Sequence, residues 1–380
     1  MGDATDDTHT DDASRRPDSG ISDTSSISDS DNRPEAAHPH KPRPRPRPRF
    51  IIGSIFLAIG VAVSVVTSVT PWPSAMLIRA VFEQGGKATA AEMDRHVPAS
   101  AATDLTEHRD VVYGDAGSDT SLDVFTPKSG TTPLATVVWI HGGAWISGQK
   151  EDVDPYLRIL AGNGYTTIGV NYTIAPEAEY PTAVTQLNDA LGFITEHAAE
   201  WNVDPGRIVL AGDSAGAQLA SQLAVLTTNP DYAHLIGIAP KLRPEQLVGT
   251  ILNCGVYDLQ RMADLNGIAA WGFKIALWGY TGTKDWSSTY AGATMSTRDF
   301  VTSAFPPTFI SGGNGDDLTW IESVPMSASL KAAGVEVTEL FWPANHEPQL
   351  PHEYQFHLDL PDAQTALTRT LAFLKTTTGN

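Results

Sequence analysis

The feature that most limits the possible folds is a series of short apolar runs separated by helix-compatible stretches, which begins near residue 105. Each run has the length of a buried strand and is rich in Val, Ile and aromatic residues. Strands that are apolar throughout and alternate with helices belong to mostly parallel sheets covered on both faces. The expected fold class is therefore α/β. The runs are TVVWIHGG, YTTIGVNY, RIVLAGDS, GTILNCGVYDL, PPTFISGG and VEVTELFW.

The N-terminal part of the chain has a different composition. Residues 1–49 are rich in Asp, Ser, Thr and Pro and contain few large apolar side chains, so they cannot bury enough surface to order themselves. The segment ends in KPRPRPRPRF, where proline at every second position excludes a helix and favours an extended rod. We predict a disordered tail.

Residues 50–70, FIIGSIFLAIGVAVSVVTSVT, are apolar or small, and no charge occurs between Arg49 and Arg79. This length suits a single transmembrane helix. The basic run directly before it places the N-terminus in the cytoplasm, and the rest of the chain outside it, by the positive-inside rule. A cleaved signal peptide is the alternative, but the stretch is long for one and no A-x-A site follows. Residues 71–104 are expected to connect this cell-membrane anchor to a domain over residues 105–380.

Charge and cysteine content exclude several kinds of function. A formal net charge of −19 argues against a nucleic-acid partner, because binding phosphates requires a basic face. The single cysteine, Cys254, excludes an internal disulfide and is expected to be a small buried side chain. No GxGxxG, P-loop or HExxH pattern occurs, so the sequence predicts no cofactor and no metal.

A nucleophile is predicted where the apolar run RIVLAGDS meets the helical stretch AGAQLASQLAVL. The junction reads Gly-Asp-Ser-Ala-Gly, a G-x-S-x-G pattern between a strand and a helix, with Ser214 at its centre. The two glycines permit a turn too tight for side chains, and this turn lifts the serine above the sheet edge. The bland alternative is a glycine-rich turn without a catalytic role.

An oxyanion hole is predicted after the run TVVWI, where the chain continues as His-Gly-Gly-Ala-Trp. Small residues there allow backbone N–H groups to point into a cavity, where they stabilise the oxyanion of a tetrahedral intermediate. The candidate donors are the amides of Gly143, Ala144 and Ala215, the last directly after the nucleophile. We interpret His141 as a structural residue that braces the loop.

Together, HGGAW, NYTIAPEAEYPTAVTQLND and GDSAG resemble the hormone-sensitive-lipase-like branch of the α/β-hydrolases over about residues 110–375. That branch shows His-Gly-Gly-Gly, Tyr-x-x-Ala-Pro-Glu and Gly-Asp-Ser-Ala-Gly in this order, and Ala144 stands here in place of the third glycine. The resemblance implies an α/β-hydrolase fold and a Ser, acid, His order along the chain. It implies a serine carboxylesterase that acts through an acyl-enzyme on a small ester.

The family's acid follows a glycine after the strand PPTFISGG, which selects Asp316, with Asp317 as the alternative. The base is expected on the loop after VEVTELFW. His352, in LPHEY, resembles the family's Pro-His-Gly-aromatic segment, and His346 remains the alternative. His357 is interpreted as a surface residue near the site. A metal cluster of these three histidines is not required by the fold.

Residues 260–305 form an expected insertion beside the site, with aromatic residues that either line an acyl pocket or pack in the core. Two other functions stay open on the sequence alone: a serine peptidase or amidase, and a non-catalytic binding protein of hydrolase fold. The sequence does not indicate an oligomeric state.

Overall fold

The computed structural model describes residues 48–380, except 129–131, 264 and 266, and for residues 48–58, 268 and 269 it describes the backbone only. Residues 1–47, most of the predicted disordered tail, therefore lie outside the described residues. The chain divides into two units, Met1–Phe56 and Leu57–Asn380. The account below concerns the second unit.

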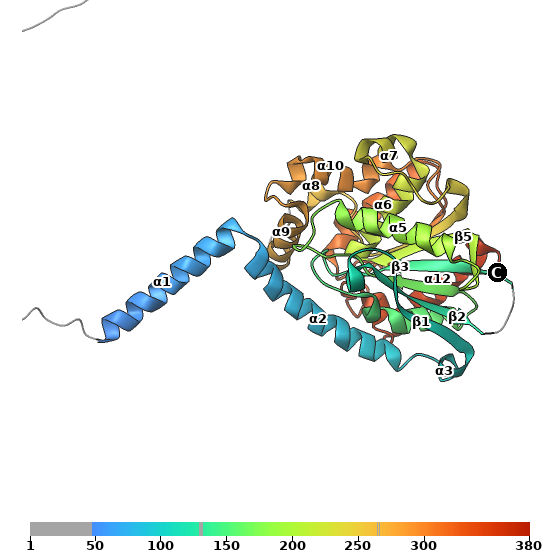
Figure 1. The fold of residues 1–380 in the computed structure, drawn as a ribbon, viewed down its shortest axis with the longest axis horizontal. Coiled ribbons are helices and arrows are strands. Elements are labelled where there is room, and N and C mark those ends of the chain that lie inside the picture. Colours follow the sequence, from blue (N-terminus) through green and yellow to red (C-terminus); the bar gives the residue numbers. More distant parts are fainter. Residues whose placement is uncertain (1–47, 129–131, 264, 266) are drawn as a thin grey trace, which may run out of the picture. The chain divides into compact units, whose positions relative to one another are not determined.

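An eight-stranded sheet forms the centre of this unit, in the order β1-β2-β4-β3-β5-β6-β7-β8 (Figure 1). β1 pairs with β2 and β2 with β4 in antiparallel fashion, while all other neighbours are parallel. The expected mostly parallel sheet is confirmed. The strands are β1 (Leu105–Val112), β2 (Ser121–Pro127), β3 (Leu134–Ile140), β4 (Thr166–Val170), β5 (Val203–Asp213), β6 (Leu247–Asn253), β7 (Thr308–Gly312) and β8 (Val337–Phe341).

Helices cover both faces of the sheet. Side chains of α5, α6 and α11 pack in one apolar cluster, and those of α4 and α12 pack in the other. Successive residues of one strand join opposite clusters: Val138 and Ile140 of β3 belong to the first, Val137 and Trp139 to the second. This is why the strands are apolar throughout. The covering helices are α4 (Asp154–Ala161), α5 (Thr182–Glu196), α6 (Ala215–Thr228), α11 (Val324–Ala332) and α12 (Pro361–Thr378).

The described residues of the expected insertion include helices α9 (Gly267–Thr281) and α10 (Tyr290–Met295), and α8 (Leu259–Met262) lies at its start. The other helices are α1 (Pro48–Val69), α2 (Trp72–Asp94), α3 (Ala101–Asp104) and α7 (Pro230–Ile236).

The predicted membrane segment coincides with helix α1. Among the described residues, no single helix has both the length and the apolar character needed to cross a bilayer. Residues Ile59–Val69 and helix α2 pass that test as a pair, with a bend of 86° between them.

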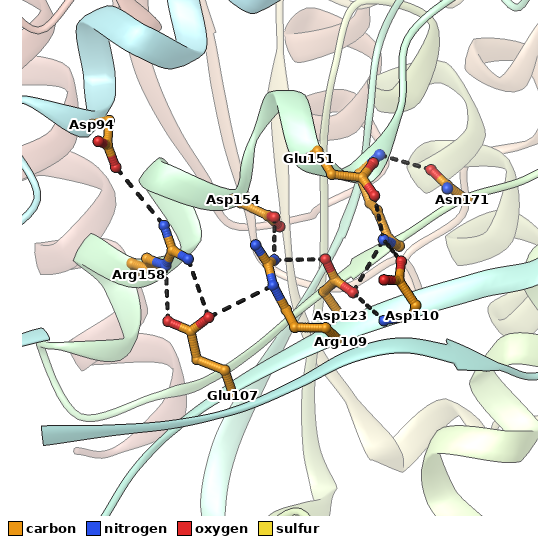
Figure 2. Close-up of polar contacts among 10 residues, drawn as sticks. Asp94, Glu107, Arg109, Asp110, Asp123, Glu151, Asp154, Arg158 and Asn171 are labelled. Atoms are coloured by element: carbon orange, nitrogen blue, oxygen red, sulfur yellow. Dashed lines mark hydrogen bonds and ion pairs between the residues drawn. The ribbon is translucent and has the colours of Figure 1, made fainter. Parts of the chain in front are cut away.

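A network of ion pairs around the buried side chains of Lys150 and Asp123 links β1 and β2 to the segment before α4 (Figure 2). The Lys150 side chain is 1% exposed, and its Nζ lies 2.7 Å from Asp110 Oδ1 and 3.1 Å from Asp123 Oδ1. Arg109 of β1 contacts the same Asp123 at 2.6 Å and also Asp154. Because buried charges are costly unless paired, the network specifies how β1 and β2 lie against this segment.

Candidate active site

Ser214 occupies the sharp turn between β5 and α6, with φ 51° and ψ −119°. A Cβ on Gly216 would lie 2.0 Å from the carbonyl oxygen of Ile140, and one on Gly212 would lie 2.4 Å from the Gly216 carbonyl carbon. Neither position accepts a side chain, which is the physical reason for both glycines of the motif. The strained backbone of Ser214 is of the kind that surrounding contacts hold in place at functional sites.

Three side chains from separate segments meet at this turn. His352 Nε2 lies 2.9 Å from Ser214 Oγ, and His352 Nδ1 lies 2.7 Å from Asp316 Oδ2. Asp316 follows β7, and its other carboxylate oxygen accepts a hydrogen bond of 3.0 Å from the Leu318 amide. The structure thus joins Ser214, His352 and Asp316 in one hydrogen-bonded series at the carboxyl ends of the parallel strands.

The alternative residues from the sequence lie elsewhere. His346 has its Nε2 3.2 Å from Asp362 Oδ2, and its ring lies 4.5 Å from that of Trp342. Asp317 is exposed, whereas Asp316 is buried. His357 is half-buried and contacts Glu92 of α2 at 3.1 Å. Of the candidate bases and acids, the structure brings only His352 and Asp316 to Ser214.

Charges around His352 favour its protonated form. Burial by itself lowers the pKa of His352, but the carboxylates of Asp316, Glu353 and Asp213 together raise it to about 9. One third of the side chain is exposed, so solvent screens part of this attraction. The group is therefore a stronger base than an ordinary histidine.

The predicted oxyanion loop follows β3 and has an unusual backbone. Gly143, Ala144 and Trp145 all have positive φ, of 106°, 52° and 59°. A Cβ on Gly143 would lie 2.2 Å from the carbonyl oxygen of Ser147, so a glycine is required there. Within the described residues, the amides of Gly143 and Ala144 have no hydrogen-bond partner, and both residues line the same cavity as Ser214. Ala215 is the first residue of α6, directly after Ser214.

His141 lies beneath this loop and is 2% exposed. Its ring stacks on Tyr172 at 4.5 Å, and its Nδ1 lies 2.8 Å from the carbonyl oxygen of Gly142. Burial lowers the pKa of His141 to about 4, so the imidazole is neutral at ordinary pH. These contacts agree with the interpretation of His141 as a brace for the loop.

A cavity of about 360 Å³ opens above Ser214. Its apolar wall includes Val81 and Phe82 of α2, Phe273 of α9, and Phe356. The stretch expected to act as a connector therefore contributes a wall of the site. Of the aromatic residues in the expected insertion, Phe273 lines this cavity, whereas Trp278, Tyr280 and Trp286 are buried and do not line it.

Three acidic residues that line the cavity, Asp152, Asp213 and Glu353, were not predicted from the sequence. Asp213, the variable residue of G-x-S-x-G, accepts hydrogen bonds from Trp139 Nε1 at 2.7 Å and from the Gly142 amide at 2.9 Å. Glu353 lines the cavity beside His352. One feature of the sequence could have indicated Glu353: it stands where the family's Pro-His-Gly-aromatic segment has glycine.

Among the described residues, Cys254 lies close enough to Asp316 and His352 to form a group of three possible metal ligands. Its thiol, Asp316 and His352 have donor atoms within 4.8 Å of one another. Burial raises the pKa of the Cys254 thiol well above its usual value, which keeps it protonated, and metals bind the thiolate. The other two groups already bond each other, so the arrangement fits proton transfer better than metal binding.

Comparisons with known proteins identify the family. The BD-FAE family model matches residues 122–331. The carboxylesterase NlhH of Mycobacterium tuberculosis is 32% identical over 276 residues, which cover 71% of this chain and 82% of that protein. An acetyl esterase of Salmonella choleraesuis is 32% identical over 149 residues, 39% of this chain and 41% of that protein.

Solved structures share the fold. Esterase B from Lactobacillus rhamnosis, in a C6-C4 SN3 inhibited form, superposes with a TM-score of 0.68 at 21% identity and covers 79% of this chain and 95% of that chain. Esterase LipW from Mycobacterium marinum gives a TM-score of 0.62 at 21% identity, over 80% of this chain and 90% of that chain. The chain belongs to the BD-FAE family and to the hormone-sensitive-lipase-like branch of the α/β-hydrolases, and it is a carboxylic ester hydrolase.

Proposed function

We propose that the chain hydrolyses esters through an acyl-enzyme on Ser214, with His352 as the base and Asp316 as its orienting acid. The observation that carries this proposal is the series Ser214 Oγ, His352 Nε2, His352 Nδ1 and Asp316 Oδ2, with separations of 2.9 and 2.7 Å. Both distances lie in the range of hydrogen bonds that transfer protons.

In the first half-reaction, Ser214 Oγ attacks the ester carbonyl carbon while His352 Nε2 takes the hydroxyl proton. Asp316 accepts the Nδ1–H of the ring, fixes the tautomer and stabilises the imidazolium. The amides of Gly143, Ala144 and Ala215 receive the oxyanion, each donor contributing about 3 kcal/mol. The imidazolium then returns its proton to the departing alcohol. In the second half-reaction, His352 takes a proton from water, which attacks the acyl carbonyl and releases the acid.

The cavity supports a small, uncharged ester as substrate. Its volume of about 360 Å³ is at the lower end for small-molecule sites. Asp152, Asp213 and Glu353 line it, and among its described lining residues there is no Lys or Arg to pair with an anionic acyl group. The relative named as an acetyl esterase is consistent with a short acyl group.

Purified full-length chain in detergent is expected to hydrolyse short-chain p-nitrophenyl esters, and Ser214→Ala is expected to abolish this activity. Full activity of the Ser214→Ala protein would overturn the mechanism. A panel of esters that varies acyl length and charge then defines the substrate.

We further propose that residues 50–70 anchor the chain in the cell membrane, with the N-terminus in the cytoplasm and the hydrolase domain outside. The support is the uncharged run itself and the basic run before it. The large side chains of the described part of α1 are also exposed, Val69 by 70% and Val63 by 56%. Protease added to intact cells should degrade the domain, and full protection together with extraction by carbonate would contradict the anchor.

A further inference from the structure

Glu353 directly follows the proposed base and has a strained backbone. Its φ is 59°, in the left-handed region that non-glycine residues rarely adopt and that persists where contacts hold it. The side chain lines the cavity, and its Oε1 lies 3.7 Å from His352 Nε2. We therefore expect a contact that stabilises the strained backbone of Glu353.

That contact is Asp213, which is 3% exposed and directly precedes Ser214. The two carboxyl groups lie close enough for the Glu353 carboxylate to raise the pKa of Asp213. Their proximity is also visible around Gly142, where a Cβ would lie 2.3 Å from Asp213 Oδ2 and 2.9 Å from Glu353 Oε1. Because an ionised carboxylate only accepts hydrogen bonds, a direct bond between the two groups requires that one of them carry a proton.

The groups around Asp213 and Glu353 favour a state in which the two carboxyl groups keep one proton over a state in which both are ionised. Burial and the neighbouring Glu353 carboxylate raise the pKa of Asp213 well above its usual value. The titratable groups that face the pair are His352, Cys254, Tyr172 and, behind His352, Asp316. Of these, His352 alone can offset a negative charge, and it is neutral when it acts as the base.

Asp213 continues the connection to the oxyanion loop. Its carboxyl oxygens accept hydrogen bonds from Trp139 Nε1 and from the amide of Gly142, the residue directly before Gly143. A series of contacts therefore runs from the turn that carries His352, through the adjacent carboxyl groups of Glu353 and Asp213, to the loop that is proposed to hold the oxyanion.

We propose that Asp213 and Glu353 share a single proton, and that this carboxyl pair positions the base and the oxyanion loop relative to each other. Glu353 is thereby a positioning residue. The proposal deepens the proposed function and rests on the roles given there to His352 and to the loop.

Two substitutions of similar size separate the hydrogen bond from packing. Glu353→Gln keeps a donor for Asp213 and is expected to lower kcat far less than a substitution that removes the bond. Glu353→Met fills the same space without the bond, and we expect its kcat to fall about a hundredfold, because displacing a reacting group by ~1 Å costs that much. KM should change little in both. Equal kcat for the two variants, whether high or low, would overturn the positioning role.

The shared proton has a spectroscopic signature that is independent of activity. At about pH 8, where ordinary carboxyl groups are ionised, the infrared difference between the wild-type protein and Asp213→Asn should contain the carbonyl band of a protonated carboxyl group. Absence of that band would overturn the shared proton even in an active enzyme. Because the band does not require turnover, it also tests the pair if Ser214→Ala retains activity, which would overturn the proposed mechanism instead.

Discussion

Arg79 of helix α2 forms a bidentate ion pair with Glu177, with both N–O distances at 2.6 Å. The same guanidinium donates to the carbonyl oxygens of Ile146 and Ala175, at 2.6 and 2.7 Å. Arg79 therefore fastens α2 to the loop after the oxyanion residues and to the Ala-Pro-Glu segment. This gives Glu177 of that segment a physical role, because α2 carries Val81 and Phe82 into the cavity wall.

Arg79→Ala is expected to loosen this wall without touching the proton-transfer series. Removal of the guanidinium leaves two carbonyls and a carboxylate without their donor, so KM for short esters should rise several-fold while kcat changes less. Steady-state kinetics on the full chain measures both. Arg95→Ala serves as the control, since Arg95 lies at the C-terminal end of α2 and forms an exposed pair with Asp359. An equal effect of the two substitutions would contradict the assignment.

Alanine substitutions distinguish the two candidate bases. His352→Ala should lower kcat by about a thousandfold, because general-base catalysis typically contributes 10²–10⁴. His346→Ala should retain nearly full activity, since His346 contacts Asp362 and Trp342 and not Ser214. Hydrolysis of p-nitrophenyl acetate at saturating substrate checks both. The opposite ranking would place the base at His346.

The pH profile reports the protonation of His352. The imidazole must be neutral to accept the serine proton, so kcat/KM should be low at acidic pH and rise with pH through the pKa of His352. That limb is expected above the ordinary histidine value of about 6.5, toward the raised value of about 9. Asp316→Asn should lower the plateau and move the limb to lower pH. A limb at or below the ordinary value in the wild-type enzyme would contradict the arrangement of carboxylates around the ring.

The network around Lys150 should contribute strongly to stability (Figure 2). Lys150→Met removes one of the two cations that contact Asp123, which is itself 1% exposed. An uncompensated buried charge costs about 3–5 kcal/mol, and because Arg109 remains beside Asp123 we expect a smaller loss of about 2–3 kcal/mol. Lys331→Met is the matched control, because the Lys331–Glu339 pair is largely exposed and such pairs contribute at most about 1 kcal/mol. Denaturant unfolding followed by circular dichroism measures the free energy of unfolding of each. Similar losses in the two variants would contradict a special role of the network.

Much of the fold and the core of the site could be predicted because their causes are local. A strand that is buried on both faces is recognisable in the sequence as a continuous apolar run, so the parallel sheet could be predicted. The two glycines of the nucleophile turn are required by contacts of 2.0 and 2.4 Å within a few ångströms of Ser214, and the motif records that requirement directly. The place of an acid and a base after later strands followed from the family resemblance.

The remaining decisions depended on contacts between distant segments, which no local pattern encodes. His346 and His352 lie on the same loop, and only its course places one ring against Ser214 and the other against Trp342. From the sequence, helix α2 was expected to be a connector, whereas in the structure Arg79 attaches it to Glu177 beside the site. In the sequence, Glu353 only stands where the related segment has glycine, and its place beside Asp213 becomes evident in the fold. The sequence by itself thus determined the sheet and the nucleophile turn, through burial pattern and backbone sterics, whereas tertiary packing decided the base, the cavity wall and the carboxyl pair.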